Sequence, residues 1–306
     1  MLKIVKTTAY SDMKMGTAGL RKKSKVVLQE NYLENVVQSV FNAIGGVKGL
    51  TFILGGDGRY YNKIAIQKIM KMAAANGMKK MIVGQNGFIS TPASSHVLLM
   101  NKADGGFVLS ASHNPGGING DFGIKYAIAS GGQCPTSVSD KIYEISKTIS
   151  EYKTLDEPDV DLSKLGTQKL GDMEIEVIDP VKDYVDMMEK IFDFAAIKKL
   201  FANGFTMVFD AMNAVTGPYA RKIFEEILGA EKGSVLNYVP LEDFGGLHPD
   251  PNLIYAKSLV DLMYSDKAPD FGAANDGDGD RNMILGKKFF VTPSDSLAIL
   301  TDNYKY

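Results

Sequence analysis

The sequence has 306 residues, of which 45% are hydrophobic and 23% charged, with a formal net charge of −2. This composition is typical of a globular protein with room for two domains, and the near balance of basic and acidic residues argues against a nucleic-acid partner. The sequence contains no apolar run of about 18 residues, so no membrane-spanning helix is predicted. The single cysteine, Cys134, cannot form an intramolecular disulfide and suggests a reducing compartment, so we expect a cytoplasmic protein. We also expect a monomer.

Strands and helices are expected to alternate through the first half of the chain, because short apolar runs are followed by segments of helical apolar spacing. Alternation of this kind predicts a largely parallel sheet with helices on both faces. Ligands collect at the carboxyl ends of strands in such sheets, and Ser112 follows one of these ends. The expected strands are Thr51–Gly55, Lys80–Gly84 and Gly106–Ala111, and the expected helices run from Ile64 to Ala73 and over Thr91–Asn101.

The alternation stops and then restarts in the second half. From Glu151 to about Asp179 the sequence is polar and irregular, and no regular element is predicted there. Asp179 followed by Pro180 predicts a helix start, with an N-cap and a proline in the first turn. The further expected strands are Phe205–Asp210, Ser234–Pro240 and Asp270–Ala274, and the further helices are Gly217–Leu228, Ala256–Tyr264 and Ser294–Asn303.

Two segments share one plan, which is a strand, a turn carrying an aspartate and then a helix. They are Thr51–Gly77 and Thr206–Gly229. We therefore predict an α/β fold of two related three-layer units with mostly parallel, mixed sheets. Residues 1–180 are assigned to the first unit, 181–294 to the second, and 295–306 to the start of a third unit that the chain does not complete.

The segment Asp276–Arg281 places three aspartates at alternate positions with glycine between them. Three hard oxygen ligands without a nearby His or Cys favour Mg²⁺ or Mn²⁺ over Zn²⁺. An EF-hand loop is excluded, because its sixth and twelfth positions would be Arg281 and Lys287 instead of Gly and Glu. A solvated acidic turn, and a haloacid-type phosphatase with Asp276 as nucleophile, remain as alternatives.

The segment Ser110–Gly117 presents the hydroxyl of Ser112 in a tight, glycine-flanked loop. His113 follows it directly, and adjacent residues rarely pair as nucleophile and base, so a hydrolase triad is disfavoured. An exposed serine without function is the alternative. A serine that carries a phosphate beside a divalent ion accounts for both segments, and backbone N–H groups near Gly116 could cradle the phosphate.

Other polar residues give weaker signals. Gly16–Arg21 and Gly55–Arg59 each join glycines to an arginine, and either could be a simple turn with a surface cation. Lys125 could exchange a proton if desolvated, although a solvated lysine is the alternative. His248 lies in a proline-rich turn, where packing and functional roles compete.

These motifs together resemble the α-D-phosphohexomutase superfamily, and most closely its eukaryotic glucose-type phosphoglucomutase branch. The family's serine motif, Thr-Ala-Ser-His-Asn-Pro-Gly-Gly, is matched except that Ser110 replaces the threonine. Asn275 replaces the aromatic residue that usually precedes the metal loop. The other matching segments are Gly16–Arg21, Gly55–Arg59, Leu241–Asn252 and Asp276–Arg281.

The resemblance implies exchange of glucose 1-phosphate and glucose 6-phosphate through a phosphoserine and glucose 1,6-bisphosphate. It implies catalytic roles for Ser112, His113 and Lys125, with Lys125 as a general acid or base. Mg²⁺ would be held by the phosphoserine and the three aspartates. Phosphate-binding residues would be Thr17, Arg21 and Arg281.

The family has four domains, of which this chain would cover two. We therefore expect a fragment that folds but has negligible mutase turnover. A non-catalytic, phosphoglucomutase-like protein with a structural or vesicle-associated role is the alternative.

Overall fold

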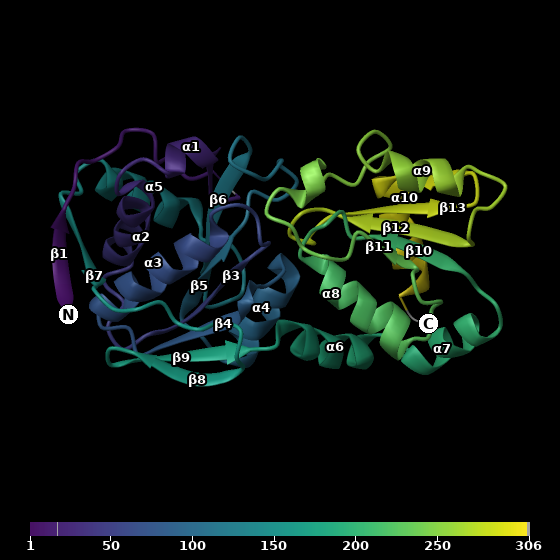
Figure 1. Ribbon diagram of the computed structural model, residues 1–306, viewed down its shortest axis with the longest axis horizontal. Coiled ribbons are helices and arrows are strands. Elements are labelled where there is room, and N and C mark those ends of the chain that lie inside the picture. Colours follow the sequence, from purple (N-terminus) through teal and green to yellow (C-terminus); the bar gives the residue numbers. More distant parts are fainter. Residues whose placement is uncertain (17, 305–306) are drawn as a thin grey trace.

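The computed structural model describes residues 1–16 and 18–304. It consists of two α/β units that lie side by side, with the amino terminus at the outer edge of the first and the described carboxyl-terminal end in the second (Figure 1). Among the described residues, no helix is both long and apolar enough to cross a bilayer. The chain therefore builds the two related α/β units that its sequence predicts.

The first unit is organised around a seven-stranded mixed sheet in the order β2-β6-β5-β3-β4-β9-β8. Its centre is parallel, because β3 pairs in parallel with β4 and β5, and β4 with β9. Antiparallel strands form both edges. The strands are β2 Leu20–Lys23, β3 Thr51–Gly56, β4 Lys80–Phe88, β5 Gly105–Leu109, β6 Asp121–Ile128, β8 Gly166–Leu170 and β9 Met173–Ile178.

Helices cover both faces of this sheet. On β3, Phe52 packs in the core beneath α2 and α3, while Ile53 packs in the core beneath α4, as expected for alternating side chains on a strand. A separate antiparallel ribbon joins β1 to β7. These elements are α1 Ser24–Val27, α2 Tyr32–Ala43, α3 Asn62–Ala75, α4 Thr91–Met100, α5 Thr136–Ser146, β1 Leu2–Lys6 and β7 Glu151–Leu155.

The second unit has a five-stranded sheet in the order β11-β10-β12-β13-β14, parallel at β11-β10-β12 and antiparallel beyond. Its strands are β10 Met207–Asp210, β11 Val235–Leu236, β12 Phe271–Asn275, β13 Asn282–Gly286 and β14 Phe289–Val291. Its helices are α6 Pro180–Ile191, α7 Phe194–Ala202, α8 Thr216–Ala220 with a π-helical continuation over Arg221–Ile227, the 3₁₀ turn Phe244–Gly246, α9 Lys257–Met263 and α10 Pro293–Asn303.

The predicted helix start at Asp179 is confirmed. Its carboxylate accepts hydrogen bonds from the backbone N–H groups of Val181 (3.0 Å) and Lys182 (3.3 Å), and Pro180 occupies the first helical position. The resulting helix α6 packs against both α4 and α8, so it connects the two units (Figure 1). The boundary that the sequence places near residue 180 stays a prediction.

The prediction of irregular structure from Glu151 to about Asp179 is wrong, because the segment contains β7, β8 and β9. In β9, alternate residues from Met173 to Val177 are buried, which is the period of a strand with one covered face. Strand β8 lies at the sheet edge and is mostly exposed, so polar residues are tolerated there. Glutamates at the half-buried positions of β9 interrupt its apolar residues, which made the strand hard to recognise.

Three smaller differences concern element lengths. Strand β11 has two residues instead of the seven predicted over Ser234–Pro240, and the remaining residues form a loop. Strand β5 ends at Leu109, before the predicted Ala111. The helix predicted over Gly217–Leu228 is present, but its second part is π-helical. The shared plan is confirmed, since β3–α3 and β10–α8 have the same order.

Candidate active site

The serine loop, Ser110–Gly117, follows the end of β5 and holds Ser112 in an unusual backbone conformation. Ser112 has φ of +54°, in the left-handed region that non-glycine residues rarely adopt. Its backbone N–H donates to the Ser110 Oγ at 2.7 Å, and the residue is 1% exposed. The replacement of the family's threonine by Ser110 therefore keeps a hydroxyl that supports the loop.

A buried ion pair fixes the serine loop from within the first unit. Arg59 and Asp57 have fully buried side chains, and the Arg59 Nη2 lies 2.9 Å from the Asp57 Oδ2. The guanidinium also donates to the carbonyl oxygens of Ser112 (2.7 Å), Asn114 (3.2 Å) and Asp121 (2.9 Å). Burial raises the pKa of Asp57, and the Arg59 charge opposes this rise. Arg59 thus holds the loop in place through its hydrogen bonds, and the alternative of a surface cation is excluded at this position.

The second unit also holds the serine loop, through the segment before the 3₁₀ turn. The Glu242 carbonyl accepts hydrogen bonds from the N–H groups of Tyr60 (2.7 Å) and Gly117 (3.1 Å). Phe244 is fully buried, with its ring 5.2 Å from the Arg59 guanidinium carbon. A Cβ at Gly116 would lie 2.7 Å from the Glu242 oxygen, so only glycine allows this close approach.

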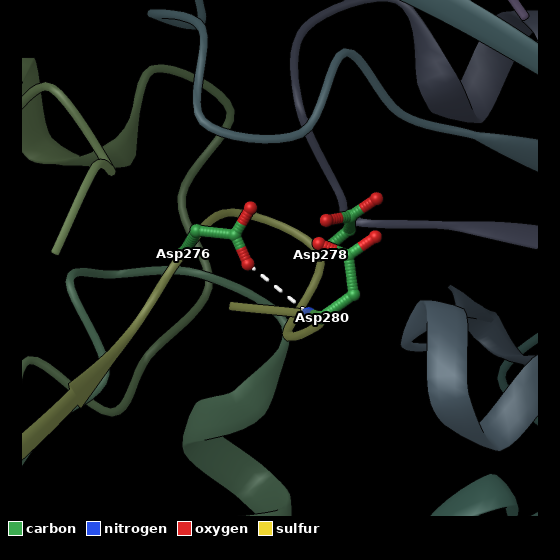
Figure 2. Close-up of side chains that lie close together, drawn as sticks. All are labelled: Asp276, Asp278 and Asp280. Atoms are coloured by element: carbon green, nitrogen blue, oxygen red, sulfur yellow. Dashed lines mark hydrogen bonds between the residues drawn. The ribbon is translucent and has the colours of Figure 1, made fainter. Parts of the chain in front are cut away.

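The aspartate loop, Asp276–Arg281, follows the end of β12 in the second unit. The Asp276 Oδ1 accepts hydrogen bonds from the N–H groups of Asp280 and Arg281, both at 3.1 Å, and the first of these is drawn in Figure 2. Gly279 supplies the positive φ of +78° that turns the chain. The loop therefore brings three carboxylates to one end of the sheet.

The two loops meet directly. The Ser112 hydroxyl donates to the Asp276 Oδ2 at 2.7 Å, although the residues are 164 positions apart. Gly277 makes the approach possible, because a Cβ there would lie 2.5 Å from the Ser112 carbonyl oxygen. The serine and the three aspartates that the sequence singles out thus occupy one site.

The carboxylates of the aspartate loop repel one another. Burial and the neighbouring Asp278 charge raise the pKa of Asp276 to about 7. Burial is the largest influence on Asp278 and would raise its pKa, but the Lys125 charge and the hydrogen bonds from Lys125, Thr91 and Ser110 together hold that pKa below its ordinary value. A divalent cation would relieve the repulsion at both residues.

The donor set fits a hard divalent cation. One carboxylate oxygen from each of Asp276, Asp278 and Asp280 lies within 4.8 Å of the others. The Asp278 Oδ1 is buried and has no hydrogen-bond partner in residues 1–16 and 18–304, which is costly unless it binds a cation. Oxygen ligands alone suit Mg²⁺ or Mn²⁺.

Lys125 lies in the same cluster, on β6 beside the serine strand. Its Nζ is 2.5 Å from the Asp278 Oδ2, 3.6 Å from the Asp280 Oδ2 and 3.3 Å from the Thr91 Oγ1. The residue is 4% exposed, so it is not a solvated surface lysine. Thr91 also supports Asp278, with its N–H on the backbone oxygen (2.9 Å) and its hydroxyl on the Oδ2 (2.7 Å).

The remaining predicted residues are placed at the edge of the site or lie outside the described residues. His113 Nδ1 is 2.6 Å from an Arg281 Nη1, and burial followed by the Arg281 charge lowers the pKa of His113. Its ring stacks at 6.4 Å on His248, at an interplanar angle of 5°. The Arg21 Nε is buried and has no hydrogen-bond partner within the described part of the chain. Thr17 lies outside the described residues.

Sequence reasoning missed two supports of the site. Thr91 was predicted only as the start of a helix, and Phe244 had no assigned role. Neither residue carries a local signal, because each acts on a loop that is distant in sequence. The buried ion pair could have been suspected from the sequence, because Asp57 and Arg59 lie two residues apart in a glycine-rich turn.

Comparison with known proteins gives consistent matches. Residues 12–153 match "Phosphoglucomutase/phosphomannomutase, alpha/beta/alpha domain I", and residues 182–288 match domain II of the same description. A phosphoglucomutase of Rhizobium radiobacter is 59% identical over 305 residues, which are 100% of this chain and 56% of that protein. A cytoplasmic phosphoglucomutase of Populus tremula is 54% identical over 98% of this chain and 55% of its own length.

A solved structure agrees with the sequence comparisons. The crystal structure of the exocytosis-sensitive phosphoprotein pp63/parafusin, a phosphoglucomutase from Paramecium, superposes with a TM-score of 0.95 at 46% identity. The match covers 99% of this chain and 57% of that one. The chain thus spans about half the length of the curated relatives it matches.

Proposed function

The chain belongs to the phosphoglucomutase/phosphomannomutase family, and from this premise we propose that it carries the phosphoryl-transfer centre of a phosphoglucomutase. The reaction would interconvert glucose 1-phosphate and glucose 6-phosphate. The observation that carries the proposal is the 2.7 Å hydrogen bond between the Ser112 hydroxyl and Asp276, across the two units. This contact supports the proposal because the hydroxyl oxygen that would act as nucleophile lies against the carboxylates that would bind a cation.

Ser112 would exchange a phosphoryl group with the sugar phosphate. In the phosphorylated state, the bond between the Ser112 Oγ and phosphorus breaks as a sugar hydroxyl oxygen bonds to that phosphorus, and the product is glucose 1,6-bisphosphate. The other phosphate of that intermediate then returns to the Ser112 Oγ. Burial of the serine at 1% exposure would limit competing attack by water.

Asp276, Asp278 and Asp280 would hold Mg²⁺, with the serine phosphate as a further oxygen ligand. A bound divalent ion neutralises charge that develops on a transferring phosphoryl group. The protein's own contribution is to keep the three carboxylates and the Ser112 oxygen within reach of one cation. Asp276 already accepts the hydrogen bond from Ser112 that the ion would replace.

Lys125 is proposed to exchange the proton of the reacting sugar hydroxyl. Its Nζ lies within the carboxylate cluster, where it forms an ion pair with Asp278. Arg21 and Arg281 are proposed to bind phosphate oxygens, together with Thr17. His113 would orient Arg281, since their nitrogen atoms are 2.6 Å apart.

Transfer of radiolabelled phosphate from glucose 1,6-bisphosphate to the protein tests the proposal. We expect an acid-stable phosphoserine that is absent in Ser112→Ala and retained in Ser95→Ala, which removes a half-buried α4 hydroxyl that donates to the Gly131 carbonyl. Asp278→Asn should retain the fold and lose both Mg²⁺ binding and labelling. A hydroxylamine-labile acyl phosphate on Asp276 would instead support the haloacid-type phosphatase.

A second role is favoured by one relative. The Paramecium protein is described as an exocytosis-sensitive phosphoprotein, which agrees with a non-catalytic, vesicle-associated alternative for this chain. The labelling experiment separates the two, because a non-catalytic protein would bind vesicles without acquiring phosphoserine from the bisphosphate.

We also propose a cytoplasmic location and a monomeric state. Relatives of similar identity are named both cytoplasmic and chloroplastic, and the cytoplasmic ones support the first proposal. Size-exclusion chromatography with light scattering would test the second.

A further inference from the structure

A cavity of about 340 Å³ lies beside the aspartate loop, where the start of α4 in the first unit faces elements of the second unit. It is partly open, and its other walls are formed by α6, α7 and α8 with its π-helical continuation. This volume falls within the range of about 300–1,000 Å³ that is typical of small-molecule sites. None of the described residues that line it is charged, and its apolar wall includes Tyr184, Met188, Phe192, Ile197 and Phe224.

One polar group in the wall has no hydrogen-bond partner among the residues that the structure describes. Thr216 is 8% exposed, and its Oγ1 makes no hydrogen bond. A buried hydroxyl left unpaired costs free energy, and a ligand atom could satisfy it. The adjoining segment Arg221–Ile227 is π-helical, a conformation that is rare and occurs frequently at functional sites.

The cavity reaches the aspartate loop at Gly279 and at Asn275, the residue that precedes the loop. Asn275 lines it and donates its side-chain amide to the Arg281 carbonyl at 2.8 Å. Gly279 also lines it, and a Cβ there would lie 2.6 Å from the Thr216 methyl group. A molecule in the cavity would therefore restrain the turn that carries the carboxylates.

The cavity also touches the residues that hold Asp278. Ser90 and Pro92 are part of its wall, and between them Thr91 binds Asp278 through two hydrogen bonds. The same occupant would thus contact the aspartate loop and its support on α4.

We propose that this cavity binds a small, uncharged, largely apolar molecule with one hydrogen-bonding group. Its occupancy restrains the aspartate loop and raises the affinity for the divalent cation. The absence of charged lining residues selects against ions, and Thr216 selects for a polar group at one end. The link to the cation rests on the proposed function, whereas binding in the cavity does not.

The first experiment measures binding without metal, by calorimetry with benzyl alcohol, toluene and benzoate as probes. We expect benzyl alcohol to bind with a dissociation constant of about 1 mM, and toluene and benzoate to bind at least about threefold more weakly. Thr216→Val should remove the preference for benzyl alcohol over toluene. Equal binding of all three probes would overturn the proposed selectivity.

The second experiment fills the cavity with larger side chains. Ala220→Leu and Ile223→Phe enlarge side chains in the wall, and either variant that retains the native circular dichroism spectrum should lose probe binding. Ala195→Leu adds the same atoms as the first variant on an exposed part of α7 and should bind normally. Binding that survives filling overturns the site. Binding that weakens as protein concentration rises would assign the cavity to a second copy of the chain, and also overturns it.

The last arm measures Mn²⁺ binding by electron paramagnetic resonance, with and without saturating benzyl alcohol. We expect about fivefold tighter Mn²⁺ binding with the probe, and no change in Ala220→Leu. Unchanged Mn²⁺ affinity in a protein that binds the probe overturns the link between cavity and loop. A protein that binds the probe but no Mn²⁺ at all contradicts the proposed metal site, and leaves cavity binding supported by the first two arms.

Discussion

The serine loop and the aspartate loop meet in one site, yet they differ in how far their polar groups are paired within the chain. In the serine loop, Ser112 donates its N–H to Ser110 and accepts a hydrogen bond from Arg59 on its carbonyl. In the aspartate loop, three carboxylates lie close together, and the buried Asp278 Oδ1 has no hydrogen-bond partner among the described residues.

The geometry of the serine loop is set by folding alone, whereas the geometry of the aspartate loop depends on a bound ligand. A loop whose polar groups are paired within the chain has its geometry set by the folded state. A loop with clustered like charges is destabilised until a cation joins it. Substitutions behind the serine loop should therefore change the free energy of unfolding, and changes at the aspartate loop should depend on metal and pH.

The largest expected effect is that of Arg59→Met. The substitution leaves the Asp57 carboxylate buried without its partner, and should lower the free energy of unfolding by about 3–5 kcal/mol. Urea unfolding at pH 7 gives this value. Arg221→Met is the matched control, because it breaks a partly exposed ion pair with Glu225 and should cost less than about 1 kcal/mol. Equal losses in the two variants would show that the serine loop does not depend on its buried pair.

A smaller effect is expected where the loops touch. Gly277→Ala places a methyl group against the Ser112 carbonyl and should push the loops apart. Misplacement by about 1 Å can slow a reaction by roughly a hundredfold, so phosphoserine formation from glucose 1,6-bisphosphate should slow by about this factor. Rapid-quench labelling measures the rate. Gly286→Ala is the control, since its nearest neighbour would be 3.8 Å away. A normal rate in Gly277→Ala would mean that the contact does not set the serine's position.

A third expected effect is a pH dependence of the metal-free protein. Asp276 has a pKa of about 7 in the folded state against an ordinary value of 3.8, so the folded state binds the proton more tightly than the unfolded state. The associated stability is present below pH 4 and is lost as pH rises through 7, with a slope of up to about 1.4 kcal/mol per pH unit. Urea unfolding in chelator from pH 4 to 8 measures it.

A variant and added metal test whether Asp276 causes this pH dependence. Asp276→Asn should flatten the Asp276 component of the pH profile, because the amide does not titrate. Added Mg²⁺ should restore stability at pH 8 and have little effect at pH 5, where a proton competes for the carboxylate. A wild-type profile identical to that of Asp276→Asn would show that the carboxylate is not strained by its neighbours.

Local patterns predicted the elements that carry their own signals. The Asp179–Pro180 start of α6 was predictable because an N-cap and a proline act within one turn. The apolar run at Thr51–Gly55 likewise matches the buried strand β3. Strands β8 and β9 were missed, because half-buried glutamates and an edge position give them polar sequences.

The composition of the site was more predictable than its geometry. Ser112 and the aspartates stood out by residue type and spacing, and the resemblance supplied their expected roles. The 2.7 Å contact between Ser112 and Asp276 depends on how two units pack, which no local pattern encodes. The burial of Arg59 was hidden for the same reason, since its partners Ser112 and Asp121 are distant in sequence.

The separation of 164 residues between Ser112 and Asp276 has a consequence for biosynthesis. At about 5–20 residues per second, a ribosome needs roughly 8–33 seconds to proceed from the serine to the aspartate. The first unit has its own core and could fold within that interval, with the serine loop still lacking its contacts from the second unit. For that time the nascent chain would display Ser112 to the surrounding solution, where other enzymes could modify it before its own metal site exists.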